Sequence, residues 1–271
     1  MNNKKEMVSI LIVTYNAEKF IHKTIQSCLN QSYDNFEILI LDNKSQDKTV
    51  DVIKKIHDNR IKLFRSKTNL GPYGGLNFLL NKASGEYIAI QDHDDIWLSK
   101  KMEKQIKFLK NNREFIACGT ATWYYFEKKK LLILNEKPKV TDFVDHTSLL
   151  FRNKGFRYKE NFILADEHFE KKILSQEGKI ACLTEGLTVH RLKENGSNLS
   201  ENRFRISFVF LREFFYLNGF NKNSLMYLSS MFVGKFLPAK IIWFIRLKVT
   251  QKNHLKLSLN TFQKKYPSVK I

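Results

Sequence analysis

The chain has 271 residues, which is enough for one large α/β domain with a small appendage or for two small domains. Its hydrophobic content of 43% is normal for a globular protein, and its three cysteines lack the spacing of a zinc site. The formal net charge is +19. No uninterrupted apolar run reaches the length of a membrane span, and the apolar run near the N-terminus is too short for a signal-peptide core. These features predict a cytoplasmic protein with buried, reduced thiols.

The first hundred residues alternate short apolar runs with amphipathic helical patterns. The apolar runs predict buried strands, and the segments between them carry apolar residues at helical spacing. We expect strands at 8–13, 36–41, 61–64 and 87–90, and helices at 17–30, 47–57, 73–82 and 99–112. Alternation of this kind builds a doubly wound, mostly parallel sheet with flanking helices, in which ligands bind beyond the carboxyl ends of the strands.

The later part of the chain is less regular. We expect strands at 115–126, 131–134 and 183–191, a helix at 163–175, and irregular loops at 140–160. From residue 203 onward the pattern is helical, aromatic and basic, with thirteen Lys and Arg residues and one acid. This change predicts a main α/β domain over 1–202 and a basic helical C-terminal region over 203–271.

Three of the expected strands end in clusters of polar side chains. The clusters are Thr14-Tyr15-Asn16, Asp42-Asn43-Lys44-Ser45 and Gln91-Asp92-His93-Asp94-Asp95. Three carboxylates within four residues repel one another unless a cation or hydrogen-bond donors neutralise them. Magnesium and similar hard cations bridge carboxylates to substrate phosphates, so the third cluster predicts a metal–diphosphate site. The alternative is an acidic surface turn or helix cap.

The ordered set of motifs resembles the family 2 glycosyltransferases, which have a GT-A fold. Val8 to Asn16 is similar to their first strand and Thr-Tyr-Asn signature, and Asp42 to Thr49 is similar to their Asp-x-x-Ser-x-Asp-x-Thr segment. Asn69 to Asn77 resembles their Asn-x-Gly segment, and Gln91 to Trp97 resembles their Asp-x-Asp-Asp motif. The resemblance covers roughly residues 7 to 200, and it is the order of the four motifs that makes it specific.

The resemblance implies a metal-dependent hexosyltransferase that uses a nucleoside-diphosphate sugar, with UDP as the expected nucleotide and Mn²⁺ or Mg²⁺ as cofactor. Asp94 would be the direct metal ligand, Asp92 would lie near the ribose and the metal, and His190 would be a third ligand or a diphosphate contact. The remaining substrate-binding residues would be Asp42 at the nucleobase, Thr14, Tyr15, Asn16 and Glu18 around the nucleoside, Asn77 in the following helix, and Arg191 at the diphosphate. Thr14, Asn16 and Asp42 could instead cap helices.

An inverting enzyme also needs a carboxylate that accepts the proton of the acceptor hydroxyl. In the resembled family this base begins a helix, in a Glu-Asp-x-x-Leu pattern followed by a basic residue. With Asp166 as base, Phe169 takes the apolar position and Lys172 the basic one; with Glu167 as base, Glu170 takes the apolar position. We therefore expect Asp166, with Glu167 as the alternative. Both acids could also simply favour the first turn of a helix.

Two departures from the family pattern limit what carries over. Ala165 replaces the usual Glu before the base, and Gly75-Leu76-Asn77 replaces Ala-Arg-Asn, so the contact of that arginine is lost. No Gln-x-x-Arg-Trp motif is present, which together with the lack of membrane spans argues against a processive synthase.

The basic C-terminal region predicts an anionic partner. Its phenylalanines interleave with Lys and Arg, as in helices that lie on a membrane surface. We expect it to dock the enzyme on the inner face of the cell membrane, where the acceptor would be a lipid-linked or cell-surface glycan of lipopolysaccharide or capsule biosynthesis. The alternative is packing on the main domain or a homodimer contact.

Three other functions are alternatives to this interpretation. Net charge alone suggests a nucleic-acid-binding protein, but no such motif is present, so we expect no nucleic acid partner. A sugar nucleotidyltransferase would carry a Gly-rich loop after the first strand, where this chain has Thr14 to Glu18. A non-catalytic relative that binds nucleotide sugars has the same motifs and differs only in activity.

Overall fold

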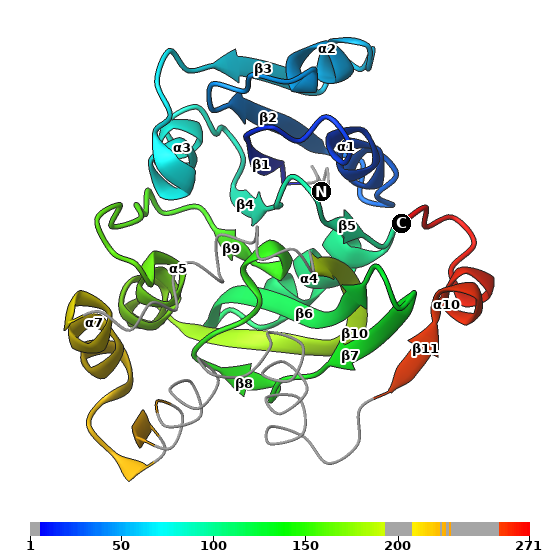
Figure 1. Ribbon diagram of the computed structural model, residues 1–271. Helices are drawn as coiled ribbons and strands as arrows, with labels where there is room; N and C mark the ends of the chain where they lie inside the picture. The colour runs from blue at the N-terminus through cyan, green and yellow to red at the C-terminus, as the bar shows by residue number, and fades with distance from the viewer. Residues whose placement is uncertain (1–5, 193–207, 223, 226–227, 229–254) are drawn as a thin grey trace, which may run out of the picture.

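The computed structural model describes residues 6–192, 208–222, 224–225, 228 and 255–271 (Figure 1). The described strands form one eleven-stranded mixed sheet, with β11-β7-β6-β9-β4-β1-β2-β3 as its main path. The predicted α/β architecture is therefore confirmed. Among the described residues, no helix combines the length and the apolar character that crossing a membrane requires.

The first half of the sheet is parallel, and its strands β1, β2 and β4 are buried on both faces. It consists of β1 (Val8–Thr14), β2 (Phe36–Asp42), β3 (Ile61–Arg65) and β4 (Tyr87–Ile90), which pair in parallel. Along β1, Ile10 and Ile12 pack with α1 (Ile21–Leu29), whereas Leu11 packs with α3 (Gly71–Leu80) on the other face. Because helices cover both faces, every core position can be apolar, which explains the continuous apolar runs in the sequence.

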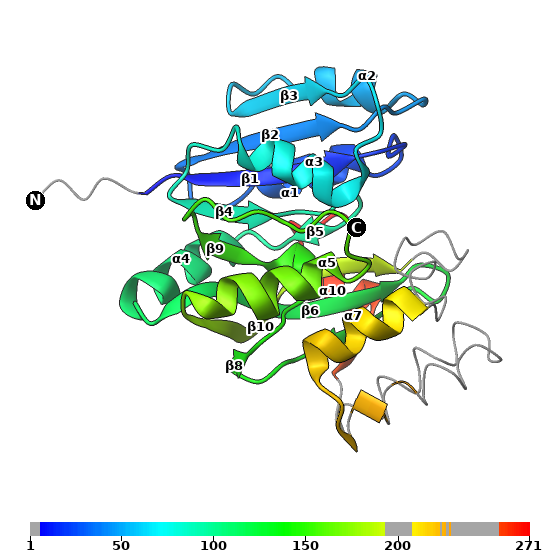
Figure 2. The same cartoon turned by 90° about the vertical axis from the view of Figure 1, so that its left-hand side faces the viewer.

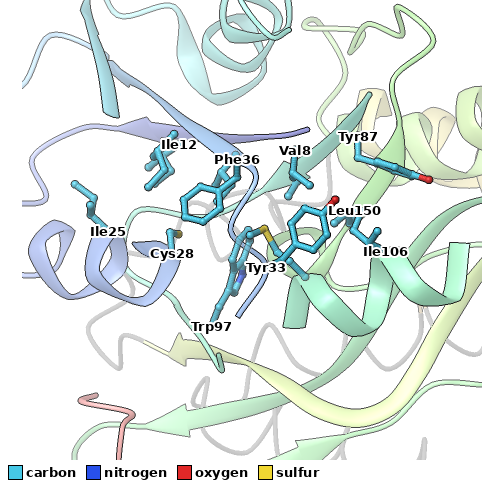
Figure 3. Close-up of a cluster of buried hydrophobic side chains, with 14 of the residues drawn as sticks. Val8, Ile12, Ile25, Cys28, Tyr33, Phe36, Tyr87, Trp97, Ile106 and Leu150 are labelled. Carbon is cyan, nitrogen blue, oxygen red and sulfur yellow. The ribbon is translucent and has the colours of Figure 1, made fainter. Parts of the chain in front are cut away.

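The larger core cluster brings together residues from distant parts of the chain (Figure 3). Ile12 and Phe36 come from the parallel strands, Ile25 and Cys28 from α1, and Trp97 from β5 (Ile96–Trp97). The three cysteines are buried and form no disulfide with one another, and burial raises the pKa of Cys28 and Cys182 to about 12.

The second half of the sheet mixes directions. The long strand β6 (Phe115–Phe126) pairs antiparallel with β7 (Leu131–Asn135) and β9 (Leu150–Arg152), and parallel with β10 (Lys179–Leu192). The two-residue strands β5 and β8 (Val140–Thr141) pair with β10. The sequence pattern did not predict β5, β8 and β9, because two or three residues are too few to show the alternation of a strand.

The remaining helices cover the sheet and connect its strands. They are α2 (Thr49–Lys54), α4 (Lys101–Asn111), the 3₁₀ turn η1 (His146–Ser148), α5 (Ala165–His168), the π-helical turn η2 (Phe169–Ile173) and the 3₁₀ turn η3 (Leu174–Gln176). The predicted helix at 163–175 is thus three consecutive turns of different winding, starting at Ala165.

The described C-terminal residues pack at two places on the main domain. Helix α7 (Phe208–Asn218) packs against Leu164, and β11 (Lys256–Ser258) leads into α10 (Leu259–Lys265), whose Phe262 contacts Trp123 at a ring-centroid distance of 5.4 Å. The expected helix is wrong at Lys256–Ser258, because pairing with the edge strand β7 holds these residues extended. About half of the predicted membrane-docking region, including 203–207 and 229–254, lies outside the described residues, and the division at residue 202 stays a prediction.

The side chain of Lys101, the first residue of α4, is fully buried. The Lys101 ammonium lies 3.8 Å from the Trp97 ring centroid and donates a 2.9 Å hydrogen bond to Gln105 Oε1. Burial lowers the pKa of Lys101 from 10.5 to about 7. The folded protein therefore releases this proton at a lower pH than the unfolded chain does.

This difference makes stability depend on pH. Between about pH 7 and pH 10.5 the unfolded chain binds the Lys101 proton and the folded protein does not, so stability rises with pH by about 1 kcal/mol per unit. We expect Lys101→Met to remove this rise, as measured by urea unfolding at pH 6, 7.5 and 9. The exposed Lys107→Met on the same helix should follow the unsubstituted protein, and parallel curves for all three proteins would contradict the prediction.

Candidate active site

The candidate site lies at the edge of the sheet to which the parallel strands point (Figure 2). Thr14 at the end of β1 is the register partner of Asp42 at the end of β2, and the acidic cluster follows β4. Strand β10 runs parallel to β6 and ends at His190 to Leu192 near the same edge. The polar clusters that the sequence places at strand ends therefore share one rim.

Buried hydrogen bonds fix the turn that carries the acidic cluster. Gln91, at the end of β4, donates to the Asp95 carbonyl at 2.8 Å and accepts from the Thr147 hydroxyl at 3.1 Å. The Thr24 hydroxyl of α1 lies 2.9 Å from the carbonyl of His93 and 3.0 Å from that of Asp95. These hydrogen bonds therefore fix the backbone of the turn that carries Asp92, Asp94 and Asp95.

Asp95 connects the acidic turn to β10. Its carboxylate is fully buried and accepts a 2.8 Å hydrogen bond from His190 Nδ1 and a 2.9 Å bond from the Arg191 backbone N–H. Burial lowers the pKa of His190, but the charge and hydrogen bond of Asp95, with Asp92 and Asp94 adding to them, outweigh burial and raise it to about 10. The Asp95 carboxylate thus holds the imidazole through Nδ1.

Three side chains could hold a metal ion together. One ligand atom each from Asp92, Asp95 and His190 lies within 4.8 Å of the others. Two carboxylates and an imidazole suit a divalent ion such as Mn²⁺, so the residues fit the expected cofactor. The predicted ligands Asp92 and His190 belong to this group. Asp94 does not, and its role as direct ligand stays a prediction.

Asp95 belongs to the acidic cluster predicted from the sequence, but the sequence indicated no individual role for it. The contact with His190 arises because Ile96, the next residue, pairs with Val189 in the β5–β10 ladder. This ladder spans two residue pairs, so no periodic signal announces it. The signal that could have found Asp95 is the second of two adjacent Asp residues, read together with the His190-Arg191 pair at another strand end.

The guanidinium of Arg191 contacts other protein groups of the site. It donates to Glu127 Oε1 at 3.0 Å and to the Asp94 carbonyl at 3.3 Å, and it stacks over the Phe20 and Tyr125 rings at 5.0 and 5.5 Å. These contacts hold the acidic turn against β10. The predicted diphosphate contact of Arg191 stays a prediction, and Glu127 is a partner that the sequence did not indicate.

The nucleoside side of the rim offers buried polar groups. The Thr14 hydroxyl is buried and has no hydrogen-bond partner among the residues that the structure describes, while Asp42 is 1% exposed and accepts from the Ser45 N–H at 3.3 Å. Arg65 Nε, at the end of β3, lies 4.0 Å from the Asp42 carboxylate. The Tyr15 ring is 42% exposed beside them and is available for stacking.

Asn16 and Glu18 hold two loops together. The Gln46 N–H donates to Asn16 Oδ1 at 2.8 Å, and the Lys48 N–H donates to Glu18 Oε2 at 2.9 Å. Asn16 adopts a left-handed conformation with φ of 48°, which asparagine tolerates better than most residues. The structure thus gives both side chains a role in shaping the loops after β1 and β2, and their predicted nucleoside contacts stay predictions.

The two candidates for the catalytic base occupy the first turn of α5. Glu167 forms a 3.4 Å ion pair with Lys171, and burial raises its pKa while Lys171 opposes that rise. Asp166 accepts a 3.1 Å hydrogen bond from the Glu167 N–H through Oδ1. Glu167 is therefore engaged with a cation of its own helix.

The apolar face of this helix does not follow the pattern used to choose between them. Phe169 is fully buried as expected, but Glu170 is fully buried as well, and burial raises its pKa well above the usual value. Its Oε2 accepts a 2.7 Å bond from the Val144 N–H, and the π-helical turn brings both side chains inward. The choice of Asp166 over Glu167 stays a prediction.

A continuous set of contacts joins the base helix to the acidic turn. The Tyr158 ring stacks on Phe169 at 3.9 Å, and its hydroxyl lies 2.9 Å from His146 Nε2. The next residue, Thr147, accepts from the Asp92 N–H at 3.4 Å. Asn77 of α3 holds the Tyr158 backbone with bonds of 2.8 and 3.0 Å, so its amide has a structural role beside the predicted substrate contact.

Comparison with known proteins identifies the class. The family model described as Glycosyl transferase family 2 matches residues 9–171. A glucosyltransferase of Escherichia coli, WfgD, is 30% identical over 206 residues, which cover 73% of this chain and 81% of that protein. The chain belongs to glycosyl transferase family 2. This membership favours a glycosyltransferase over the sugar nucleotidyltransferase alternative.

Other relatives match over different lengths. An uncharacterized glycosyltransferase of Methanocaldococcus jannaschii is 29% identical over 282 residues, which cover 96% of this chain and 95% of that protein. The Escherichia coli glucosyltransferase WfaP is 41% identical over 123 residues, 45% of this chain and 48% of that protein. The chain thus spans about half the length of several curated relatives that it matches.

Solved structures confirm the GT-A fold. Staphylococcus aureus TarS 1-349, in complex with UDP-GlcNAc, superposes with a TM-score of 0.60 at 18% identity, covering 80% of this chain and 69% of that one. The mannosyltransferase PcManGT of Pyrobaculum calidifontis, in complex with GDP-Man and Mn²⁺, gives a TM-score of 0.61 at 16% identity, covering 81% and 66%. At these identities the likeness shows a shared fold.

Proposed function

We propose that this glycosyltransferase is inverting, metal-dependent and non-processive, and that it moves a hexose from a UDP-sugar to a hydroxyl of a lipid-linked or cell-surface glycan. The observation that carries the proposal is the group formed by Asp92, Asp95 and His190 on the rim where β1, β2 and β10 end. Carboxylates so close together are suited to an ion that is itself bound to a diphosphate.

Each part of the rim has a distinct task in this proposal. Asp42 accepts a hydrogen bond from uracil N3–H, and the buried Thr14 hydroxyl is available to the nucleoside. A bound divalent ion would neutralise charge on the departing diphosphate. Asp166 accepts the proton of the acceptor hydroxyl while the network from Tyr158 to Thr147 fixes the base helix relative to the acidic turn.

The names of related proteins support the donor and the acceptor. WfgD and WfaP are both named UDP-Glc:alpha-D-GlcNAc-diphosphoundecaprenol beta-1,3-glucosyltransferase. The TarS structure is a complex with UDP-GlcNAc, whereas the PcManGT structure is a complex with GDP-Man and Mn²⁺. We infer a UDP-sugar donor, Mn²⁺ or Mg²⁺ as cofactor, and an acceptor carried on a membrane lipid. A peripheral location on the inner face of the cell membrane follows from such an acceptor.

A donor screen tests the proposal. UDP-, dTDP- and GDP-sugars are incubated with the protein and Mn²⁺ or Mg²⁺, and the released nucleoside diphosphate is measured. We expect slow, metal-dependent hydrolysis of a UDP-sugar that stops when EDTA is added, because water can replace the acceptor. Hydrolysis of GDP- or dTDP-sugars alone would contradict the uridine assignment, and no hydrolysis of any donor would favour a non-catalytic relative.

A further inference from the structure

A surface rich in lysine lies beside the candidate active site. It consists of the turn between β6 and β7 together with α10, and we call it the lysine edge: exposed Lys128, Lys129, Lys130, Lys264 and Lys265. No Asp or Glu occurs between residues 255 and 271, and the acid of the turn, Glu127, forms a 3.0 Å ion pair with Arg191. The lysine edge therefore carries an excess of positive charge.

The two parts of the lysine edge are held side by side. Ser258 of β11 pairs with Leu131 of β7, and the Leu259 N–H donates a 2.8 Å hydrogen bond to the Lys130 carbonyl. Figure 1 shows β11 along β7, with α10 beyond it. The packing of Phe262 on Trp123 fixes α10 on the sheet. The lysines thus belong to one ordered surface.

This surface is physically joined to the site. In the β6–β10 ladder Leu192 pairs with Phe126, the last residue of β6, so the turn begins beside the end of the strand that carries His190 and Arg191. Arg191 bonds to Glu127 through its guanidinium and to Asp95 through its backbone N–H. A binding partner that contacts the turn would therefore lie next to the acidic cluster.

The opposite edge of the sheet has a different charge pattern. Strand β3 ends the sheet on that side, and residues 36 to 67 mix eight Lys and Arg residues with five acids. A uniformly negative surface would be attracted to the lysine edge and only weakly to the β3 edge. The protein is thus electrostatically polarised along its sheet.

We propose that the lysine edge binds the anionic, phosphate-bearing surface of a lipid membrane. A membrane matches it because each basic residue near such a surface strengthens binding by about fivefold, and these factors multiply as more residues contact the headgroups. Bound this way, the protein turns the rim with Asp92 and His190 toward the bilayer. That orientation serves a lipid-linked acceptor, a point that rests on the proposed function, whereas the membrane contact itself does not.

Two paired substitutions test the proposal in the full chain. Lys128→Gln/Lys129→Gln neutralises two consecutive lysines of the lysine edge, and Lys54→Gln/Lys55→Gln neutralises two consecutive exposed lysines at the β3 edge. Binding is measured by co-sedimentation, without nucleotide, on phosphatidylcholine vesicles with and without phosphatidylglycerol. We expect the first variant to bind phosphatidylglycerol vesicles about 30-fold more weakly than the unsubstituted protein, and the control variant to bind almost as well as it does.

Several results would overturn the proposal. Equal losses of binding in the two variants would mean that net charge alone attracts the protein. No loss in the first variant would exclude the lysine edge. Equal binding of the unsubstituted protein to vesicles without phosphatidylglycerol would show that anionic lipid is not required. Both variants should keep the melting temperature and the UDP-sugar hydrolysis of the unsubstituted protein. Because vesicle binding is measured without donor, failure of the transferase assignment would leave this result unchanged.

Discussion

Replacing Asp166 with Asn is expected to lower kcat for sugar transfer by about 10²- to 10⁴-fold and to leave the affinity for UDP unchanged. The amide keeps the shape of the side chain, so the hydrogen bond from the Glu167 N–H can persist. It has no basic oxygen to accept the acceptor proton. Steady-state kinetics with a lipid-linked acceptor, together with calorimetric titration of UDP, separates the two effects.

Glu167→Gln is the matched control. The amide breaks the ion pair with Lys171 but lies outside the proton path if Asp166 is the base. We expect a small loss of melting temperature and little change in kcat. If Glu167→Gln lost transfer while Asp166→Asn kept it, the base would be Glu167.

Asp94→Asn and Asp95→Asn are expected to fail in different ways. Asp94→Asn should abolish the Mn²⁺-dependent part of UDP binding, because it removes the carboxylate of the proposed metal ligand. Asp95→Asn should cost about 3–5 kcal/mol of stability, since it leaves His190 without its buried partner. It should also weaken metal binding by about 10- to 100-fold through the misplaced imidazole.

Thermal unfolding and calorimetry with UDP and Mn²⁺ measure both effects. His190→Gln provides a further comparison, because it removes the imidazole but leaves both carboxylates. Retained metal-dependent binding in Asp94→Asn, with its loss in Asp95→Asn at unchanged stability, would make Asp95 the direct ligand and contradict the role predicted for Asp94.

The parallel half of the fold was predictable because its strands are buried on both faces. Continuous apolar runs such as Val8–Thr14 and Phe36–Asp42 carry a strong signal, and their polar ends follow directly. The rim that joins Thr14, Asp42 and the acidic cluster was therefore accessible from sequence. The strand β11 was not, because it is formed by pairing with β7 and not by its own composition.

The hydrogen-bond roles of the site residues depend on partners far away in the chain. Asn77 contacts Tyr158 across 81 positions, and Asp95 contacts His190 across 95. Glu18 holds a loop 30 positions away. No local pattern encodes such contacts, so motif positions alone identified which residues gather at the site without showing how each is held.

The central claim is that the acidic turn and His190 bind the donor diphosphate through a divalent ion. Isothermal titration of UDP into the protein tests it most directly, once with Mn²⁺ and once with EDTA. The account predicts binding with Mn²⁺ that disappears in EDTA. Equal affinity for UDP in the two conditions would contradict it.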